Sequence, residues 1–168
     1  ANPHEKLFKA AGQEGIPTAF VVKGGKIAWI GHPMNGLDLQ VAEACGDKEY
    51  AAKAKEMKKL QGQFGEAMEA EEWDDALKAA DKILAIKPGE HQLGLAKYMI
   101  LATKKKDTQA AGKYGREFVD KCDDAMMLNE FSWNMLTEEE WADAKDLKLA
   151  LAAAKKADAH AFISALPE

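Results

Sequence analysis

Residues 73–88 read WDDALKAADKILAIKP, and this stretch decides the fold class. Its apolar side chains recur at the i, i+3, i+4 and i+7 spacing of one helical face, which predicts an amphipathic helix. They are Trp73, Ala76, Leu77, Ala80, Ile83 and Leu84. The run Lys87-Pro88-Gly89 then ends the helix, because proline cannot continue helical hydrogen bonding.

Further helical patterns lie on both sides of this stretch. Upstream, Tyr50 and Leu60 belong to one helical face, which we expect to be interrupted at Gly62 and Gly65. Downstream, apolar periodicity predicts helices over residues 93–100, 110–122, 127–136 and 147–157. Predicted N-caps are Asp107, Asp146 and the capping-box pattern Thr137-x-x-Glu140. From residue 47 onward the sequence therefore predicts helices alone.

The helices recur in pairs about 35 residues apart, a period typical of stacked helical repeats. The segment from Trp73 to Pro88 resembles the second helix of a tetratricopeptide repeat, with Ala96 as the small residue where paired helices touch. This resemblance implies that residues 47–168 form antiparallel helix pairs of a short α-superhelix, which acts through protein contacts.

The first 46 residues have a different sequence pattern, with signals for β-strands. Two β-branched and aromatic runs, from Thr18 to Val22 and from Lys26 to Ile30, flank Gly24-Gly25 and predict a β-hairpin. We expect a helix from Asn2-Pro3 to Gly12 before the hairpin and a short helix over residues 37–44 after it. The fold class predicted for the whole chain is mainly α, with a small α+β segment.

The run from Gly15 to Pro33, GIPTAFVVKGGKIAWIGHP, resembles the second half of a thioredoxin-like (redoxin, TlpA-type) domain. The resemblance implies that residues 1–46 are an incomplete α-β-β-α piece of that fold. It also implies a cis Ile16–Pro17 bond, a peptide-docking edge at Ile16, Pro17 and Thr18, and a bacterial periplasmic or cell-envelope location. The family's catalytic CxxC would lie upstream of Ala1, and the sequence contains no CxxC.

A two-stranded hairpin is marginal in water, and the strand from Thr18 to Val22 would lack its family neighbour. Three outcomes are open. The helices cover this edge, two copies pair through it, or the chain is a fragment of a longer protein. We expect a fragment that self-associates as a homodimer through the edge.

Composition and charge exclude several functions. The chain of 168 residues carries a formal charge of −5, and residues 1–46 hold equal numbers of basic and acidic side chains, so the helical region is acidic. An acidic surface disfavours nucleic acid, and no apolar run reaches the ~20 residues that cross a bilayer. No motif for a phosphate, metal or cofactor occurs, so we expect no cofactor and no metal site.

A few side chains are candidates for binding. His32 follows the second strand, where functional loops often lie, although a solvated loop histidine is the simpler interpretation. Trp133 belongs to a soft group that either fills the core or forms a pliable contact surface. Its other members are Met126, Met127, Phe131 and Met135. Cys45 and Cys122 lie on apolar helix faces, which predicts buried, inert thiols.

These observations favour a protein–protein or self-interaction module attached to a redox-inactive thioredoxin-like remnant. The binding residues of this hypothesis are Ile16, Pro17, Thr18, His32 and Trp133, and it assigns no catalytic residue. Two enzymatic alternatives stay open. One is a thiol-disulfide oxidoreductase whose CxxC half is missing, and the other is a hydrolase assembled from scattered His, Asp and Glu side chains.

Overall fold

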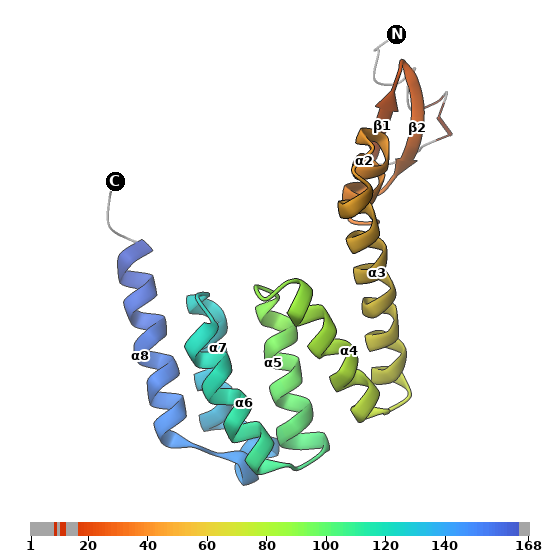
Figure 1. Cartoon of the computed structure of the whole chain (residues 1–168). Coiled ribbons are helices and arrows are strands. Elements are labelled where there is room, and N and C mark those ends of the chain that lie inside the picture. The colour runs from red at the N-terminus through yellow and green to blue at the C-terminus, as the bar shows by residue number, and fades with distance from the viewer. Residues whose placement is uncertain (1–8, 10, 13–16, 165–168) are drawn as a thin grey trace. The chain divides into compact units, whose positions relative to one another are not determined.

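The structure is a computed structural model that describes Lys9, Ala11, Gly12 and residues 17–164, with side chains described as far as residue 159. Figure 1 labels its elements. They are β1 (Ala19–Lys23), β2 (Lys26–Gly31), α2 (Leu37–Cys45), α3 (Lys48–Glu69), α4 (Trp73–Ile86), α5 (His91–Met99), the π-helical turn η1 (Ile100–Lys104), α6 (Thr108–Lys121), α7 (Ala125–Thr137), the 3₁₀ segment η2 (Glu139–Ala144) and α8 (Leu147–Ser164). The predicted mainly α fold class is confirmed.

The chain divides into two compact units, Ala1–Lys59 and Leu60–Glu168. The division falls inside α3, and the domain boundary predicted after residue 46 stays a prediction. The helix predicted from Asn2 to Gly12 lies largely outside the described residues. In the part of the chain that the structure describes, every helix is too short or too polar to cross a bilayer.

The predicted hairpin is confirmed in unit 1 (Figure 1). Strands β1 and β2 are antiparallel, with Ala19 opposite Gly31 and Lys23 opposite Lys26. Gly24 and Gly25 form the turn with φ angles of 58° and 76°, which is the left-handed region that a tight hairpin turn requires. Helix α2 packs against β1 and, to a lesser extent, against β2.

The predicted interruption of the third helix was wrong. Helix α3 runs unbroken from Lys48 to Glu69 through Gly62 and Gly65. Each interior glycine costs a helix about 1 kcal/mol relative to alanine, and the surrounding Lys, Glu, Gln, Met and Ala residues are strong helix formers that offset this cost. Leu60 and Ala67 are buried on the same helix, so packing on both sides of the glycines stabilises it further.

The turn after α3 contains a left-handed backbone conformation that the sequence does not predict. Glu71 has φ 57°, in the left-handed region, and the Glu72 N–H donates to the Ala67 carbonyl at 2.8 Å. A left-handed residue at this position ends many helices and is usually glycine. Glu71 therefore holds a strained conformation in order to start α4 at Trp73.

Replacing Glu71 with glycine should raise the free energy of unfolding by about 0.5–1 kcal/mol, because glycine adopts positive φ without the steric cost. The matched control is Glu72→Gly, since Glu72 is also exposed but has φ −84° and gains nothing from glycine. Urea denaturation followed by circular dichroism measures both variants. Equal effects of the two substitutions would contradict a strained Glu71.

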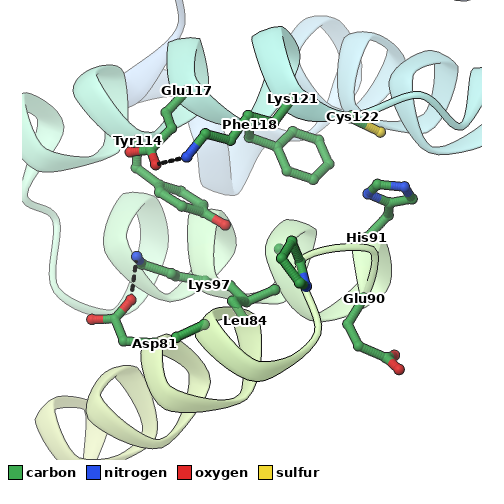
Figure 2. Close-up of a pocket in the computed structure, with 13 residues that line it drawn as sticks. Asp81, Leu84, Glu90, His91, Lys97, Tyr114, Glu117, Phe118, Lys121 and Cys122 are labelled. Atoms are coloured by element: carbon green, nitrogen blue, oxygen red, sulfur yellow. Dashed lines mark hydrogen bonds and ion pairs between the residues drawn. The ribbon is translucent and has the colours of Figure 1, made fainter.

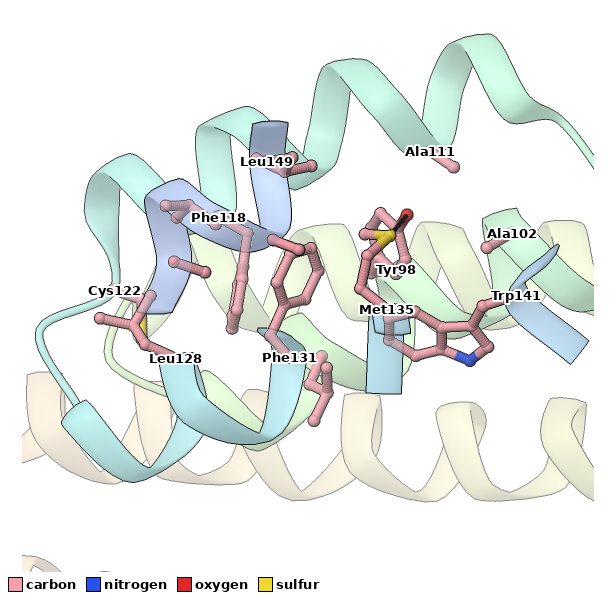
Figure 3. Close-up of a cluster of buried hydrophobic side chains, with 14 of the residues drawn as sticks. Tyr98, Ala102, Ala111, Phe118, Cys122, Leu128, Phe131, Met135, Trp141 and Leu149 are labelled. Atoms are coloured by element: carbon pink, nitrogen blue, oxygen red, sulfur yellow. Dashed lines mark hydrogen bonds between the residues drawn. The ribbon is translucent and has the colours of Figure 1, made fainter. Parts of the chain in front are cut away.

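In unit 2 the helices pack as antiparallel neighbours (Figure 1) around one large core. The most extensive contact is between α7 and α8, and α5 lies against α4, α6 and α7. The core centres on four aromatic rings that Figure 3 shows together: Tyr98, Phe118, Phe131 and Trp141. The Tyr98 and Phe131 ring centroids are 4.8 Å apart at 74°, an edge-to-face contact. A smaller cluster joins Ala67, Ala76 and Ile100.

The predicted caps are confirmed at two of three helices. The Asp107 carboxylate accepts from the Ala110 N–H at 2.9 Å, and Asp146 accepts from the N–H groups of Lys148 and Leu149 at 3.0 Å each. The capping box at Thr137 was wrong. Its hydroxyl donates backward to the Trp133 carbonyl at 2.9 Å, because Thr137 is the last residue of α7.

Candidate functional site

Helices α4, α5 and α6 enclose a pocket of about 250 Å³ in unit 2 (Figure 2). Its apolar part is formed by Leu84 on α4, Pro88 in the turn after α4 and Phe118 on α6. Its polar lining consists of Asp81, Glu90, His91, Lys97, Tyr114, Glu117 and Lys121. A pocket with this many ionisable groups is a candidate catalytic or ligand-binding site.

Each cation of this pocket already has a partner within the protein. The Lys97 ammonium lies 2.5 Å from an Asp81 carboxylate oxygen and 4.0 Å from the centre of the Tyr114 ring. Figure 2 shows the Lys97–Asp81 contact beside the pair formed by Lys121 and Glu117, whose charged atoms lie 2.7 Å apart. The Lys97–Asp81 pair joins α5 to α4, whereas Lys121 and Glu117 pair within α6, so these charges interact with the protein itself and not with a ligand.

His91 also pairs with a carboxylate of the protein itself. Its Nε2 atom lies 2.7 Å from a carboxylate oxygen of Asp123, which ties the start of α5 to the loop after α6. The ring is largely buried, whereas the Asp123 carboxylate is exposed. This pairing gives His91 a structural role at the junction of two helices.

The Cys122 thiol also lines the pocket (Figure 2). Burial raises the pKa of this thiol, and the nearby Asp124 and Asp123 carboxylates act in the same direction, against the lowering effect of a backbone hydrogen bond with Asp124. A thiol with a raised pKa is protonated at neutral pH and is a poor nucleophile. The predicted burial of Cys122 is confirmed, and its lack of reactivity stays a prediction.

The prediction that Cys45 is buried was wrong. Cys45 is the last residue of α2 and is exposed, and both cysteines are free. It lies in an apolar groove of about 620 Å³ in unit 1, together with Pro33, Leu37, Val41 and Tyr50. Only Ala42 of α2 is buried, because few elements of unit 1 pack against this helix.

The residues predicted to bind fall in both units. Pro17 and Thr18 lie just before β1, Pro17 exposed and Thr18 half-buried, while Ile16 and the cis Ile16–Pro17 bond lie outside the described residues. His32 follows β2, and its Nδ1 accepts from the Met34 N–H at 3.1 Å. Because Ala19 pairs with Gly31, Thr18 and His32 are the next residues at one end of the hairpin. Trp133 belongs to unit 2.

Trp133 lies on the outer face of α7 with 63% of its surface exposed. Met126, seven residues earlier, is 77% exposed and lies on the same helical face, with Glu130 between them. The soft group of the sequence is therefore divided. Phe131 and Met135 fill the core, whereas Met126 and Trp133 face away from it. Other exposed apolar side chains of these two helices are Leu136 on α7 and Leu147 and Leu151 on α8.

Sequence reasoning identified Trp133 but missed Glu130 and the paired charges of the α4–α5–α6 pocket. The spacing of Met126, Glu130 and Trp133, at i, i+4 and i+7, is the signal that could have shown one continuous face. No comparable signal exists for His91 and Asp123, which are 32 positions apart. Among the described residues, no group of three or more His, Cys, Asp and Glu side chains is placed to hold a metal ion.

Comparisons of the chain with protein-family models, with curated proteins and with solved structures find no match. The fold and the candidate site together define a mainly helical protein with a two-stranded sheet and an exposed apolar helix face.

Proposed function

We propose that this chain works by holding another polypeptide, through the outer face of α7 in its helical unit. The observation that carries the proposal is the exposure of Met126 and Trp133, two large apolar side chains on one helical face. Exposed apolar patches of this kind mark contact surfaces, and tryptophan is among the residues that contribute most to binding energy.

The remaining features fit contact better than catalysis. The charges of the α4–α5–α6 pocket are paired internally, and the Cys122 pKa is raised by burial. Disulfide exchange needs a low-pKa thiolate beside a resolving thiol, and the sequence contains no CxxC. We therefore propose that residues 1–46 are a redox-inactive thioredoxin-like remnant. An insulin-reduction assay that shows turnover by the purified chain would contradict this part.

We further propose that the antiparallel helices of unit 2 are tetratricopeptide-like pairs of a short superhelix. The break at Lys87-Pro88-Gly89 between α4 and α5 supports this proposal, as does the alternating direction of α4, α5 and α6 (Figure 1). A homodimer through the edge from Thr18 to Val22 is the proposed form of self-association. It would join two small sheets into one of four strands, which is a more stable size.

Site-specific photocrosslinking tests the contact function. A photoreactive phenylalanine analogue in place of Trp133 should form a covalent adduct with a second polypeptide in the cell of origin. The matched control places the same group at Lys113, an exposed position on α6. The adduct's mass separates a second copy of this 18.4 kDa chain from another protein. Equal labelling at positions 133 and 113 would contradict a contact surface on α7.

A further inference from the structure

The outer face of α7 carries charge as well as apolar surface. Glu130 lies between Met126 and Trp133 on this face, directly opposite the buried side that holds Leu128 and Phe131. Leu136, one turn further along, is 47% exposed. The face thus carries two large apolar side chains with a carboxylate between them.

The surrounding sequence is acidic without interruption. Residues 122–144 contain no Lys, Arg or His. Their carboxylates are Asp123, Asp124, Glu130, Glu138, Glu139, Glu140 and Asp143. Asp124 caps α7 by accepting from the Met126 and Met127 N–H groups, and Asp123 pairs with His91. Within the described part of the chain, the other five carboxylates form no ion pair.

This excess of one charge restricts what can lie on the face. Phosphate backbones and anionic lipid surfaces are repelled by Glu130 on the face and by the four carboxylates of residues 138–143, which directly follow α7 in the sequence. A polypeptide with Lys or Arg beside its apolar residues would gain both the burial of Met126 and Trp133 and the neutralisation of the carboxylates. Methionine adds adaptability, because its flexible thioether fits partners of different shape.

We propose that the partner of α7 is a basic amphipathic helical segment of another protein, with apolar residues at i, i+3, i+4 and i+7 and lysines or arginines on their flanks. The inference rests on the proposed contact function and deepens it by naming the chemistry of the partner. The observation that carries it is the run of carboxylates on and after α7 that form no ion pair among the described residues.

The experiment uses the full chain and two designed peptides with the same helical leucine pattern. One carries lysine and the other glutamate at the polar positions. Fluorescence anisotropy of the labelled peptides should show binding of the lysine peptide alone, and the affinity should fall as salt rises because charge attraction is screened. Binding of both peptides, or of neither, would overturn the inference.

Variants of the full chain locate the binding. Trp133→Ser should weaken binding of the lysine peptide about tenfold or more, as loss of a central aromatic contact does, and Glu130→Lys should weaken it as well. The controls are Leu151→Ser, an exposed apolar residue of α8, and Glu66→Lys, an exposed glutamate of α3. Equal losses in variants and controls would mean that the peptide binds through total charge alone, which overturns the inference.

The photocrosslinking result separates the two proposals. An adduct at position 133 with a segment that lacks basic residues overturns the inference but supports the contact function. An adduct with the mass of two copies of this chain does the same, since it replaces the basic partner by self-association. No adduct at all contradicts the contact function itself.

Discussion

Replacing Phe131 with alanine should lower the free energy of unfolding by about 3–5 kcal/mol, the usual cost of removing a buried ring. Phe131 is fully buried on α7 and joins rings from three other elements (Figure 3). Its centroid lies 4.8 Å from that of Tyr98, 5.4 Å from that of Phe118 and 5.9 Å from that of Trp141. Because α5, α6 and η2 each supply one of these rings, the cavity would weaken every contact at the centre of unit 2.

Urea denaturation followed by near-ultraviolet circular dichroism measures this loss, since the signal comes from packed aromatic side chains. The matched control is Trp133→Ala, two residues later on the same helix. Trp133 is exposed, so its removal should change the free energy of unfolding by no more than about 0.5 kcal/mol. A control as damaging as Phe131→Ala would mean that the two sides of α7 were assigned the wrong way round.

The contrast between Phe131 and Trp133 shows where prediction from the sequence stops. Both sides of α7 carry large apolar residues, so periodicity alone finds the helix but does not identify its buried side. Ser132 lies on the buried side, where its hydroxyl donates to the Ala150 carbonyl at 3.0 Å. The acceptor of that hydrogen bond lies on α8, and no local pattern in the sequence of α7 predicts it.

Local chemistry explains the successful predictions. The hairpin follows from Gly24-Gly25, and the caps at Asp107 and Asp146 follow from a carboxylate placed just before an apolar periodic run. These features depend on a few consecutive residues, so the sequence contains all the information they need. Helix α4 was predicted for the same reason, from Trp73 to the break at Lys87.

The failures depend on neighbours that are distant in sequence. Cys45 was expected to be buried, and its exposure results from the small number of elements around α2 in unit 1. Helix α3 was expected to break at Gly62 and Gly65, where packing of Leu60 and Ala67 opposes the break. Likewise, the Lys97–Asp81 pair joins α5 to α4, and the His91–Asp123 pair joins α5 to the loop after α6. The candidate site could therefore be predicted only at Trp133.

Two glycines of α6 should respond to alanine with opposite signs. A Cβ atom at Gly115 would lie 2.8 Å from a Leu149 methyl carbon and 2.8 Å from a Tyr98 ring carbon. At Gly112 the nearest atom would be an Arg116 guanidinium nitrogen at 3.7 Å, which is ordinary contact. Alanine gains about 1 kcal/mol of helix propensity at either position, but overpacking a core typically costs about 1–3 kcal/mol.

Gly115→Ala should therefore lower the free energy of unfolding by up to about 2 kcal/mol, because the Tyr98 ring is fully buried and held between Phe131 and Trp141. Gly112→Ala should raise it by about 0.5–1 kcal/mol. The two substitutions are chemically identical and three residues apart on one helix. The difference between the urea midpoints of the two variants is therefore free of any general effect of alanine on α6. Stabilisation by Gly115→Ala equal to that by Gly112→Ala would show that α6 does not approach Tyr98 and Leu149 as closely as the core requires.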